Sequence, residues 1–263
     1  MNKLIISTVI FFIVSFGVLS LDFDYHYQSN SGKYISLAPS LTEIVYEIGA
    51  QDNLIAVSTC CNHPEQAQEK IKVGGLFYTS EEEILKLKPE RIFALIDQKP
   101  IIDRLKFFTS DVHYYDFRTF EDIYNCINSI GKLTGHEDEA QNLVKKMKAR
   151  IDTMKTSESK DIIYIIQVEP VITAGKRSFI SDLIEKSGHN NVVAEINDSY
   201  PEVSLEYIIS KKPDIIVLQN KYYADYLKQF INTEYILLSP ELAEISGRPG
   251  PRIYEALEFF ASL

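Results

Sequence analysis

The chain has few positive charges and lacks the short motifs that mark common enzymes. Its 27 Lys and Arg residues are outnumbered by 37 Asp and Glu residues, and its formal net charge is −10. Binding to nucleic acid or to an anionic membrane requires clustered Lys and Arg, and the sequence contains no basic run. A nucleophile elbow, a P-loop, a dinucleotide-binding glycine fingerprint and clustered metal ligands are also missing. These absences argue against a nucleic-acid binder and against the common exported enzymes.

Cysteine and histidine are too few and too scattered to indicate a metal site. Adjacent Cys60 and Cys61 would bridge each other only with backbone strain, so at most one ordinary disulfide can form, from one of them to Cys126. The five histidines show no metal-ligand spacing. A hydrolase that pairs Cys60 or Cys61 with His63 stays a formal alternative, although a separation of two or three residues on one loop is poor geometry for such a pair.

The N-terminus has the pattern of a secretory signal peptide. Lys3 supplies a positive charge, residues 4–19 are mostly apolar, and Val18-Leu19-Ser20 is a small-residue cleavage pattern. We expect residues 1–20 to be removed. An uncleaved anchor is the alternative, but the apolar run is shorter than the ~20 residues that a spanning helix needs. No cysteine follows the run, so we expect an exported protein without a lipid, which fits a Gram-negative periplasm.

One sequence pattern occurs twice. Residues 80–92 read SEEEILKLKPERI, and residues 204–216 read SLEYIISKKPDII, with Ser, Glu, Ile, Lys-Pro and Ile in one ungapped register. Each copy predicts a helix that is opened by a serine cap, stops before a proline and is followed by a buried strand. Ordinary helix–proline–strand punctuation is the alternative explanation. We favour a duplication, which predicts two similar α/β lobes with a site in the crevice between them.

Both halves of the chain alternate expected strands and helices. The expected strands are 34–38, 54–58, 92–96, 112–117, 162–167, 192–193, 215–218 and 236–238. Besides the two repeat copies, we expect helices at 178–186 and 251–263, and one that starts with a capping box of Ser40 and Glu43 and ends at Gly49. Such an alternation favours parallel sheets.

Two helical patterns separate the halves. Apolar residues recur at helical spacing through 120–130 and again through 140–154, with a break at Gly131 to Gly135. We interpret residues 136–158 as one long helix of about 30 Å that joins an N-terminal lobe, 33–135, to a C-terminal lobe, 159–263. The predicted fold class is therefore α/β, with two Rossmann-like lobes that each hold a mainly parallel sheet, bridged by one long α-helix.

Several strings together resemble one protein family. They are ISLAPSLTEIVYEIG, STCCNHP, VGG, SYPEVSLEYIISKKPDIIVL and SGRPGPRIYEALE, in this order. They look like the Fe/cobalamin periplasmic-binding proteins, the substrate-binding subunits of ABC importers for cobalamin, haem and ferric siderophores. The similarity covers residues 33–263 and is nearest to the cobalamin-binding branch. It implies the class III periplasmic-binding-protein fold, agreeing with the two lobes and bridging helix.

The resemblance implies a ligand site between the lobes, on loops that follow the carboxyl ends of strands. The matching residues are Pro39, Ser40, Cys60, Cys61, Leu76, Phe77, Tyr78, Leu95, Ile172, Glu244, Ile245 and Arg248. Members of this branch often cover the corrin with Trp or Tyr, and this chain has no Trp. An aliphatic cleft can still bury a flat macrocycle by area alone.

The cysteines and arginines of these strings have more than one candidate role. Cys60 or Cys61 could coordinate cobalt or haem iron as a thiolate, or could be a packed or bridged residue. Arg248 could bind a carboxylate or phosphate group of the ligand. Arg252 could do the same or cap the last helix.

The resemblance also gives the repeated glutamates a role. In the family, one Glu on each lobe docks onto arginines of the permease dimer, and the matching residues are Glu82 and Glu206. Two carboxylates on related lobes form a pseudo-twofold footprint for a twofold partner. The alternative is that each is a first-turn Glu favoured by the helix dipole.

The expected function is therefore binding rather than catalysis. We expect a monomeric periplasmic substrate-binding protein that delivers a corrinoid to the permease of an ABC importer, without a cofactor of its own. A haem or ferric-siderophore binding protein is the first alternative, and an exported Cys-dependent hydrolase is the second.

Overall fold

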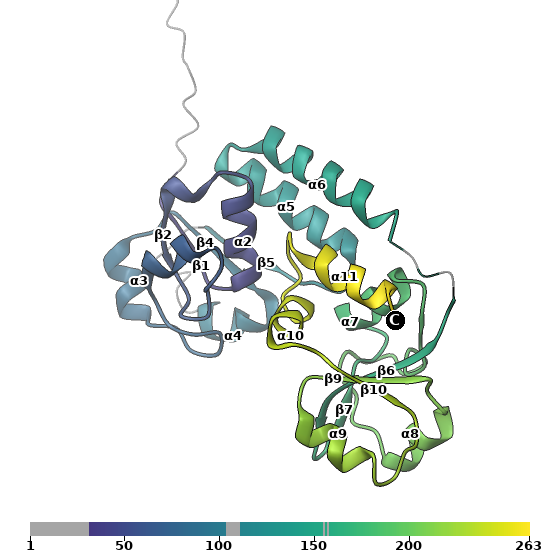
Figure 1. Ribbon diagram of the computed structural model, residues 1–263. Coiled ribbons are helices and arrows are strands. Elements are labelled where there is room, and N and C mark those ends of the chain that lie inside the picture. The colour runs from purple at the N-terminus through teal and green to yellow at the C-terminus, as the bar shows by residue number, and fades with distance from the viewer. Residues whose placement is uncertain (1–31, 104–110, 155, 157) are drawn as a thin grey trace, which may run out of the picture. The chain divides into compact units, whose positions relative to one another are not determined.

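The computed structural model describes residues 32–103, 111–154, 156 and 158–263 (Figure 1). The predicted signal peptide, residues 1–20, lies outside the described residues. The residues from Ser31 to Leu263 form one compact unit. In the part of the chain that the structure describes, no helix combines the length and the apolar character that crossing a membrane demands.

The first lobe is built on a parallel sheet with the strand order β3-β2-β1-β4-β5. Its strands are β1 (Tyr34–Ser36), β2 (Leu54–Val57), β3 (Ile71–Lys72), β4 (Arg91–Leu95) and β5 (Asp111–Tyr115). Its helices are α2 (Pro39–Glu47), α3 (Glu81–Leu87), α4 (Lys99–Ile102) and α5 (Phe120–Thr134), with 3₁₀ turns at Gln51–Asn53, Glu65–Glu69 and Ile96–Gln98. Alternate residues of β1 and β4 pack into separate buried clusters, which is the burial that a parallel sheet covered on both faces requires.

The second lobe is built on a sheet with the order β10-β9-β6-β7, and β8 also pairs with β6. Its strands are β6 (Asp161–Val168), β7 (Val171–Thr173), β8 (Asn190–Asn191), β9 (Ile215–Leu218) and β10 (Glu234–Leu237). Its helices are α7 (Phe179–Lys186), α8 (Leu205–Lys211), α9 (Lys221–Leu227), α10 (Pro240–Ser246) and α11 (Ile253–Ala261). The hairpin of β6 and β7 is antiparallel and the other pairings between these strands are parallel.

The two repeat copies fold in the same way at their helix ends. Ser80 caps α3 and Ser204 caps α8, because each side chain accepts a hydrogen bond from the backbone N–H three residues later. Both helices end at a lysine in the left-handed region, with φ of 48° at Lys88 and 49° at Lys212. This shared backbone conformation extends the similarity beyond the matching residue types.

The copies also occupy equivalent places in the two sheets. The strand that follows each copy pairs in parallel with the strand that comes first along the chain in its own sheet. Ile92 of β4 lies opposite Ile35 of β1, and Ile216 of β9 lies opposite Ile163 of β6. The prediction of two similar α/β lobes is confirmed.

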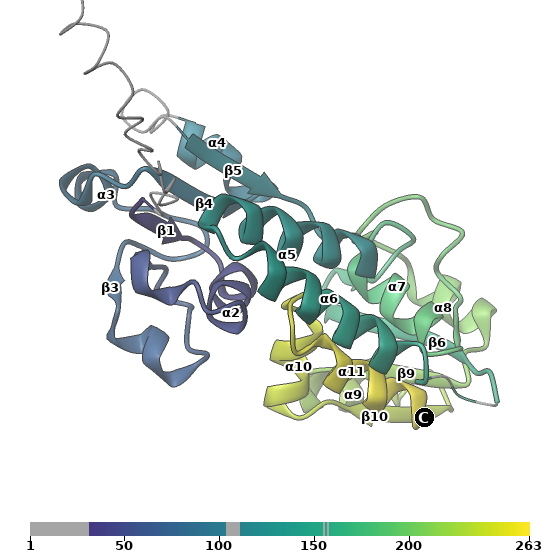
Figure 2. The same ribbon diagram turned by 90° about the horizontal axis from the view of Figure 1, so that it is seen from above.

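Residues 120–151 form a pair of antiparallel helices that lie side by side in both views (Figures 1 and 2). Helices α5 and α6 (Glu137–Ile151) have 15 residues each, and Gly135, with φ of 76°, ends α5. A Cβ atom on Gly131 would come within 2.4 Å of the Ala140 Cβ, so the close approach of the two helices requires glycine there. Helix α6 leads toward β6 and is the connecting helix, but it ends at Ile151 rather than at residue 158.

The expected capping box of Ser40 and Glu43 is wrong. Helix α2 starts at Pro39, the residue Ala38 is the N-cap, and no side chain caps the helix. The proline holds Ala38 in an extended conformation, with φ of −139° and ψ of 146°, and so starts the helix before Ser40. The end of the helix is as expected, because Gly49 has φ of 78°.

Some other elements differ from the expectation. The strand expected at 192–193 lies two residues earlier, at β8. The chain turns after β8, where the Val193 N–H donates to the Asn191 side chain at 3.1 Å. Helices α9 and α10 and the short strands β3 and β7 were not expected.

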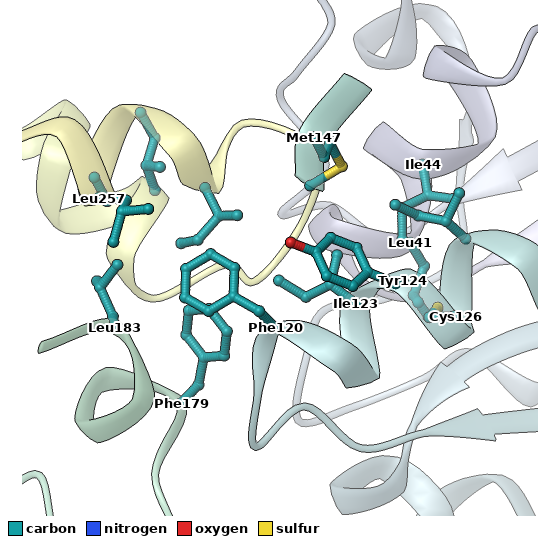
Figure 3. Close-up of a cluster of buried hydrophobic side chains, with 14 of the residues drawn as sticks. Leu41, Ile44, Phe120, Ile123, Tyr124, Cys126, Met147, Phe179, Leu183 and Leu257 are labelled. Atoms are coloured by element: carbon teal, nitrogen blue, oxygen red, sulfur yellow. The ribbon is translucent and has the colours of Figure 1, made fainter. Parts of the chain in front are cut away.

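One core joins the lobes (Figure 3). The rings of Phe120 of α5 and Phe179 of α7 lie 5.3 Å apart between their centroids. Figure 3 shows them between Leu183 and Leu257 on one side and residues of α5 and α2 on the other. Because this cluster removes apolar surface of both lobes from water, it stabilises their packing against each other.

Candidate functional site

A cleft of about 300 Å³ lies where the loops at the carboxyl ends of the first sheet meet the second lobe. Open α/β sheets bind ligands in this position. The first lobe contributes residues after β3, β4 and β5, and the second lobe contributes the start of α7, the residue Tyr200 and the end of α10.

A buried glutamine orders the wall formed by the first lobe. The Gln98 amide donates to the backbone oxygens of Leu37 and Leu76, both at 3.1 Å, and its oxygen accepts from the Leu95 N–H at 2.9 Å. One side chain therefore ties together the loops that follow β1, β3 and β4. Leu95 ends β4 and Leu76 belongs to the loop after β3, so both cleft-lining residues are held before any ligand arrives.

Most of the cleft surface is apolar or aromatic. Phe117 follows β5, Phe179 and Ile180 begin α7, and Tyr200 precedes the second repeat copy. Phe77 and Tyr200 also reach the solvent, with 83% and 53% of their surface exposed. Exposed apolar groups of this size beside a hollow are typical of a binding site.

The charged groups that line the cleft are acidic. They are Asp97 and Asp116, and no Lys or Arg occurs among the described residues of the cleft wall. Loss of water raises the pKa of the Tyr200 hydroxyl, Arg118 opposes this shift, and the two carboxylates reinforce it. The neutral phenol is therefore favoured at this position.

Arg118 connects the lobes at one side of the cleft. Its Nε donates to both Asp116 carboxylate oxygens at 2.9 Å, within the first lobe. Its Nη1 donates to the backbone oxygen of Arg177 at 3.1 Å and to the Ser199 hydroxyl, in the second lobe. Asp116 and Tyr200, which adjoin these groups, both line the cleft.

Arg248 makes a second connection. Its Nη1 donates to the Asn62 side-chain oxygen at 2.6 Å and forms an ion pair with Glu244 at 3.4 Å. Asn62 follows Cys61 in the first lobe, so the contact joins the lobes. Glu244 and Ile245, expected on a loop, lie in α10, which Ser239 caps and Pro240 begins. The structure places Glu244 and Arg248 in this contact rather than in the cleft wall.

Cys61 is a packed residue. It is 1% exposed, and its sulfur lies 3.1 Å from the Thr42 hydroxyl and 3.2 Å from the Ser58 hydroxyl. Burial raises the pKa of its thiol, which disfavours the thiolate that a metal ion binds. Cys60, Cys61 and Cys126 are all free thiols. The structure thus supports the packed alternative for Cys61 over a bridge or a metal ligand.

The structure brings only part of the predicted ligand site together. Leu76, Phe77 and Leu95 line the cleft. The predicted residues outside its wall are Pro39, Ser40, Cys60, Cys61, Tyr78, Ile172, Glu244, Ile245 and Arg248. Pro39 and Ser40 are buried in α2, and Ile172 belongs to β7 rather than to a loop.

Several cleft residues were missed. Tyr115 to Phe117 close the strand expected at 112–117, so the rule that ligands bind at carboxyl ends would have found them. Phe179 and Ile180 carry no such signal, because an apolar pair at the start of a helix usually belongs to a core.

The repeated glutamates occupy equivalent exposed positions. Glu82 is the second residue of α3 and Glu206 is the second residue of α8. Glu82 forms an ion pair with Lys86 at 2.9 Å. Hydrogen bonds from its own backbone N–H and from Ser204 lower the pKa of Glu206. Both carboxylates are therefore charged and open to a partner.

Known proteins resemble this chain along most of its length. A vitamin B12-binding protein of Vibrio parahaemolyticus is 30% identical over 190 residues, which are 70% of this chain and 69% of that protein. A vitamin B12-binding protein of Photorhabdus laumondii is 28% identical over 237 residues, or 86% and 85% of the two chains.

Solved structures show the same fold. A possible iron-binding (periplasmic solute-binding) protein of Staphylococcus epidermidis is 28% identical, with a TM-score of 0.75 over 88% of this chain and 98% of the other. A periplasmic heme-binding protein of Vibrio cholerae is 18% identical and has a TM-score of 0.75 over 88% of this chain and 98% of the other. The model of the periplasmic binding protein family matches residues 35–246. The chain therefore belongs to the periplasmic binding protein family.

Proposed function

We propose that this protein is the periplasmic substrate-binding protein of an ABC importer and that it captures a corrinoid between its lobes. The observation that carries the proposal is the cleft, whose apolar and aromatic walls come from both lobes. Such a surface buries a flat macrocycle by removing its faces from water. Export through cleavage of residues 1–20 is part of the proposal.

The charges of the cleft favour a corrinoid over haem. Haem carries two propionates, and the charged groups on the cleft wall are the carboxylates Asp97 and Asp116. The peripheral amides of a corrinoid are neutral and do not meet this repulsion. The vitamin B12-binding relatives support the same choice.

The size of the cleft requires the ligand to extend beyond it. Its volume of about 300 Å³ is at the lower end of the range for drug-sized ligands, and a corrinoid is larger than these. Phe77 and Tyr200 stand at the mouth, where their exposed rings would cover the part of the macrocycle that protrudes. We expect the contacts of Arg118 and Arg248 between the lobes to limit how far the cleft opens.

Delivery of the ligand to the permease would use the two repeated glutamates. Glu82 and Glu206 begin equivalent helices in the two lobes and are exposed. We propose that they dock onto positive groups of a twofold permease, since charge pairs of this kind set orientation and association rate.

A titration with three chelates tests the ligand. Cyanocobalamin, haemin and a ferric catecholate are added separately while binding is followed by calorimetry and by the absorption spectrum. We expect saturable binding of cyanocobalamin that is tighter than binding of the other two. The variant Tyr200→Ala should bind it about tenfold more weakly, because an aromatic contact at the rim is lost.

The matched control is Tyr222→Ala, which removes a similarly exposed ring from α9, outside the cleft wall. It should leave the affinity unchanged. Tighter binding of haemin would favour the haem alternative. Absence of saturable binding of all three chelates would overturn the proposed function.

A further inference from the structure

Beside the cleft lies a second hollow with a different character. It has a volume of about 370 Å³, and its wall carries the three positive side chains of Arg118, Lys176 and Arg177. The two hollows adjoin along the chain, because Asp116 and Phe117 line the first and Arg118 and Thr119 line the second.

Two of the three cations are uncommitted. Arg118 is engaged with Asp116, whereas the exposed Lys176 and Arg177 form no ion pair with the residues that the structure describes. Two carboxylates, Asp182 and Glu185, also line the hollow. That of Asp182 accepts the Phe120 N–H at 2.7 Å and so faces the start of α5. The described wall of this hollow therefore has two exposed cations, Lys176 and Arg177, and one exposed carboxylate, that of Glu185.

The turn that carries Lys176 and Arg177 is held rigidly. Backbone N–H groups of Gly175, Lys176 and Arg177 donate to the oxygens of Ser199, Ile196 and Asp198 at 2.9 to 3.1 Å. A Cβ atom on Gly175 would lie 2.5 Å from the Asp198 oxygen, so this close pairing requires glycine. Because the backbone of Lys176 and Arg177 is already ordered, binding of an anion by these side chains costs less conformational entropy.

The same backbone continues into the cleft. The segment that holds the turn ends at Tyr200, and Arg177 is followed within three residues by Phe179 and Ile180, all of which line the cleft. A ligand with a flat apolar body in the cleft would therefore carry an attached anionic group toward this turn.

We propose that Lys176 and Arg177 bind the anionic appendage of the chelate whose body fills the cleft. This inference rests on the proposed function and narrows its ligand class. For a corrinoid, the appendage is the phosphodiester of the nucleotide loop, which guanidinium and ammonium groups bind through charge-assisted hydrogen bonds. The protein then distinguishes a complete corrinoid from one that lacks the loop.

The test compares two corrinoids, cyanocobalamin and dicyanocobinamide, which lacks the phosphodiester. Calorimetry measures both affinities for the wild-type protein and for the double variant Lys176→Gln/Arg177→Gln. We expect the wild type to bind cyanocobalamin about tenfold more tightly than dicyanocobinamide, and the variant to lose that preference. The affinity of the variant for dicyanocobinamide should equal that of the wild type.

The matched control is Lys145→Gln/Lys146→Gln, which removes two exposed charges from α6. It should keep the preference. The subsite is disproved if the Lys176/Arg177 variant retains the preference, or if it binds dicyanocobinamide more weakly than the wild type does. Binding of dicyanocobinamide by the wild type still supports the proposed function in that case, whereas failure to bind either corrinoid overturns the proposed function itself.

Discussion

At the residue scale, the buried carboxyl group of Glu43 stands out. It lies on α2 with 5% of its surface exposed, beside the segment that carries Arg248 and Arg252. Loss of water raises its pKa from 4.5 to about 7, the two arginines oppose this shift, and Glu255 and Glu47 reinforce it. Glu43 therefore titrates near neutral pH.

The sign of its effect on stability follows from the raised pKa. The folded state holds the proton more tightly than the unfolded state, so the stability linked to Glu43 is full below pH 4.5 and is lost as the pH rises through about 7. Glu43→Gln mimics the protonated form. We expect the advantage of this variant over wild type to grow between pH 5 and pH 8 by about 2.5 kcal/mol in the free energy of unfolding.

Urea unfolding at several pH values measures this advantage. Glu47→Gln, one turn later on the same helix and exposed, is the matched control. An advantage of Glu43→Gln that is no larger at pH 8 than at pH 5, or an equal gain for Glu47→Gln, would contradict the assignment.

At the element scale, the helix ends of the two repeat copies are strained in the same way. Lys88 and Lys212 have left-handed backbones, a conformation that costs a non-glycine residue about 1 kcal/mol. Lys88→Gly and Lys212→Gly should each raise the free energy of unfolding by about 0.5–1 kcal/mol. The sites lie in different lobes, so the gains should add in the double variant.

Chemical denaturation compares these variants with Ser210→Gly, which places glycine inside α8. This control should lose about 1 kcal/mol, because its backbone is helical. If all the glycine variants were destabilised alike, the left-handed lysines would not be strained.

These elements also show what the sequence can and cannot predict. Ser80 and Ser204 predicted helix starts because a cap acts on the N–H groups next to it in the chain. The left-handed lysines were not predicted, since lysine carries no preference for that conformation. The cleft was predicted only where one loop defines it, as at Leu76 and Phe77.

The rest of the cleft depends on which distant segments meet. Phe117 and Phe179 are 62 positions apart in the chain and line the same cleft, and no local pattern reports this. Arg248 was predicted to bind a ligand because a free arginine suits that role. Only the fold shows that Asn62 already accepts its hydrogen bond.

At the scale of the whole molecule, the two exposed glutamates predict how handover fails. Glu82→Lys/Glu206→Lys should abolish import in cells while leaving the affinity for the ligand unchanged, because both residues lie outside the cleft wall. Each single reversal should reduce import partially. The ion pair of Glu82 with Lys86 is exposed and offers little resistance to a new partner.

Uptake of labelled corrinoid measures this, together with calorimetry on the purified variants. Asp138→Lys/Glu234→Lys reverses two other exposed carboxylates, on α6 and β10, and should import normally. Undiminished import by the Glu82/Glu206 variant would remove these residues from the docking site.

The core shared by the lobes has a further consequence. The sequence contains two copies of one pattern, yet Phe120 and Phe179 pack in a single core to which both lobes contribute. A fragment of the chain that ends between α6 and β6 would expose the apolar surface that this shared core buries. We therefore expect neither lobe to fold when it is produced alone. The two lobes, although they carry copies of one sequence pattern, form a single folding unit.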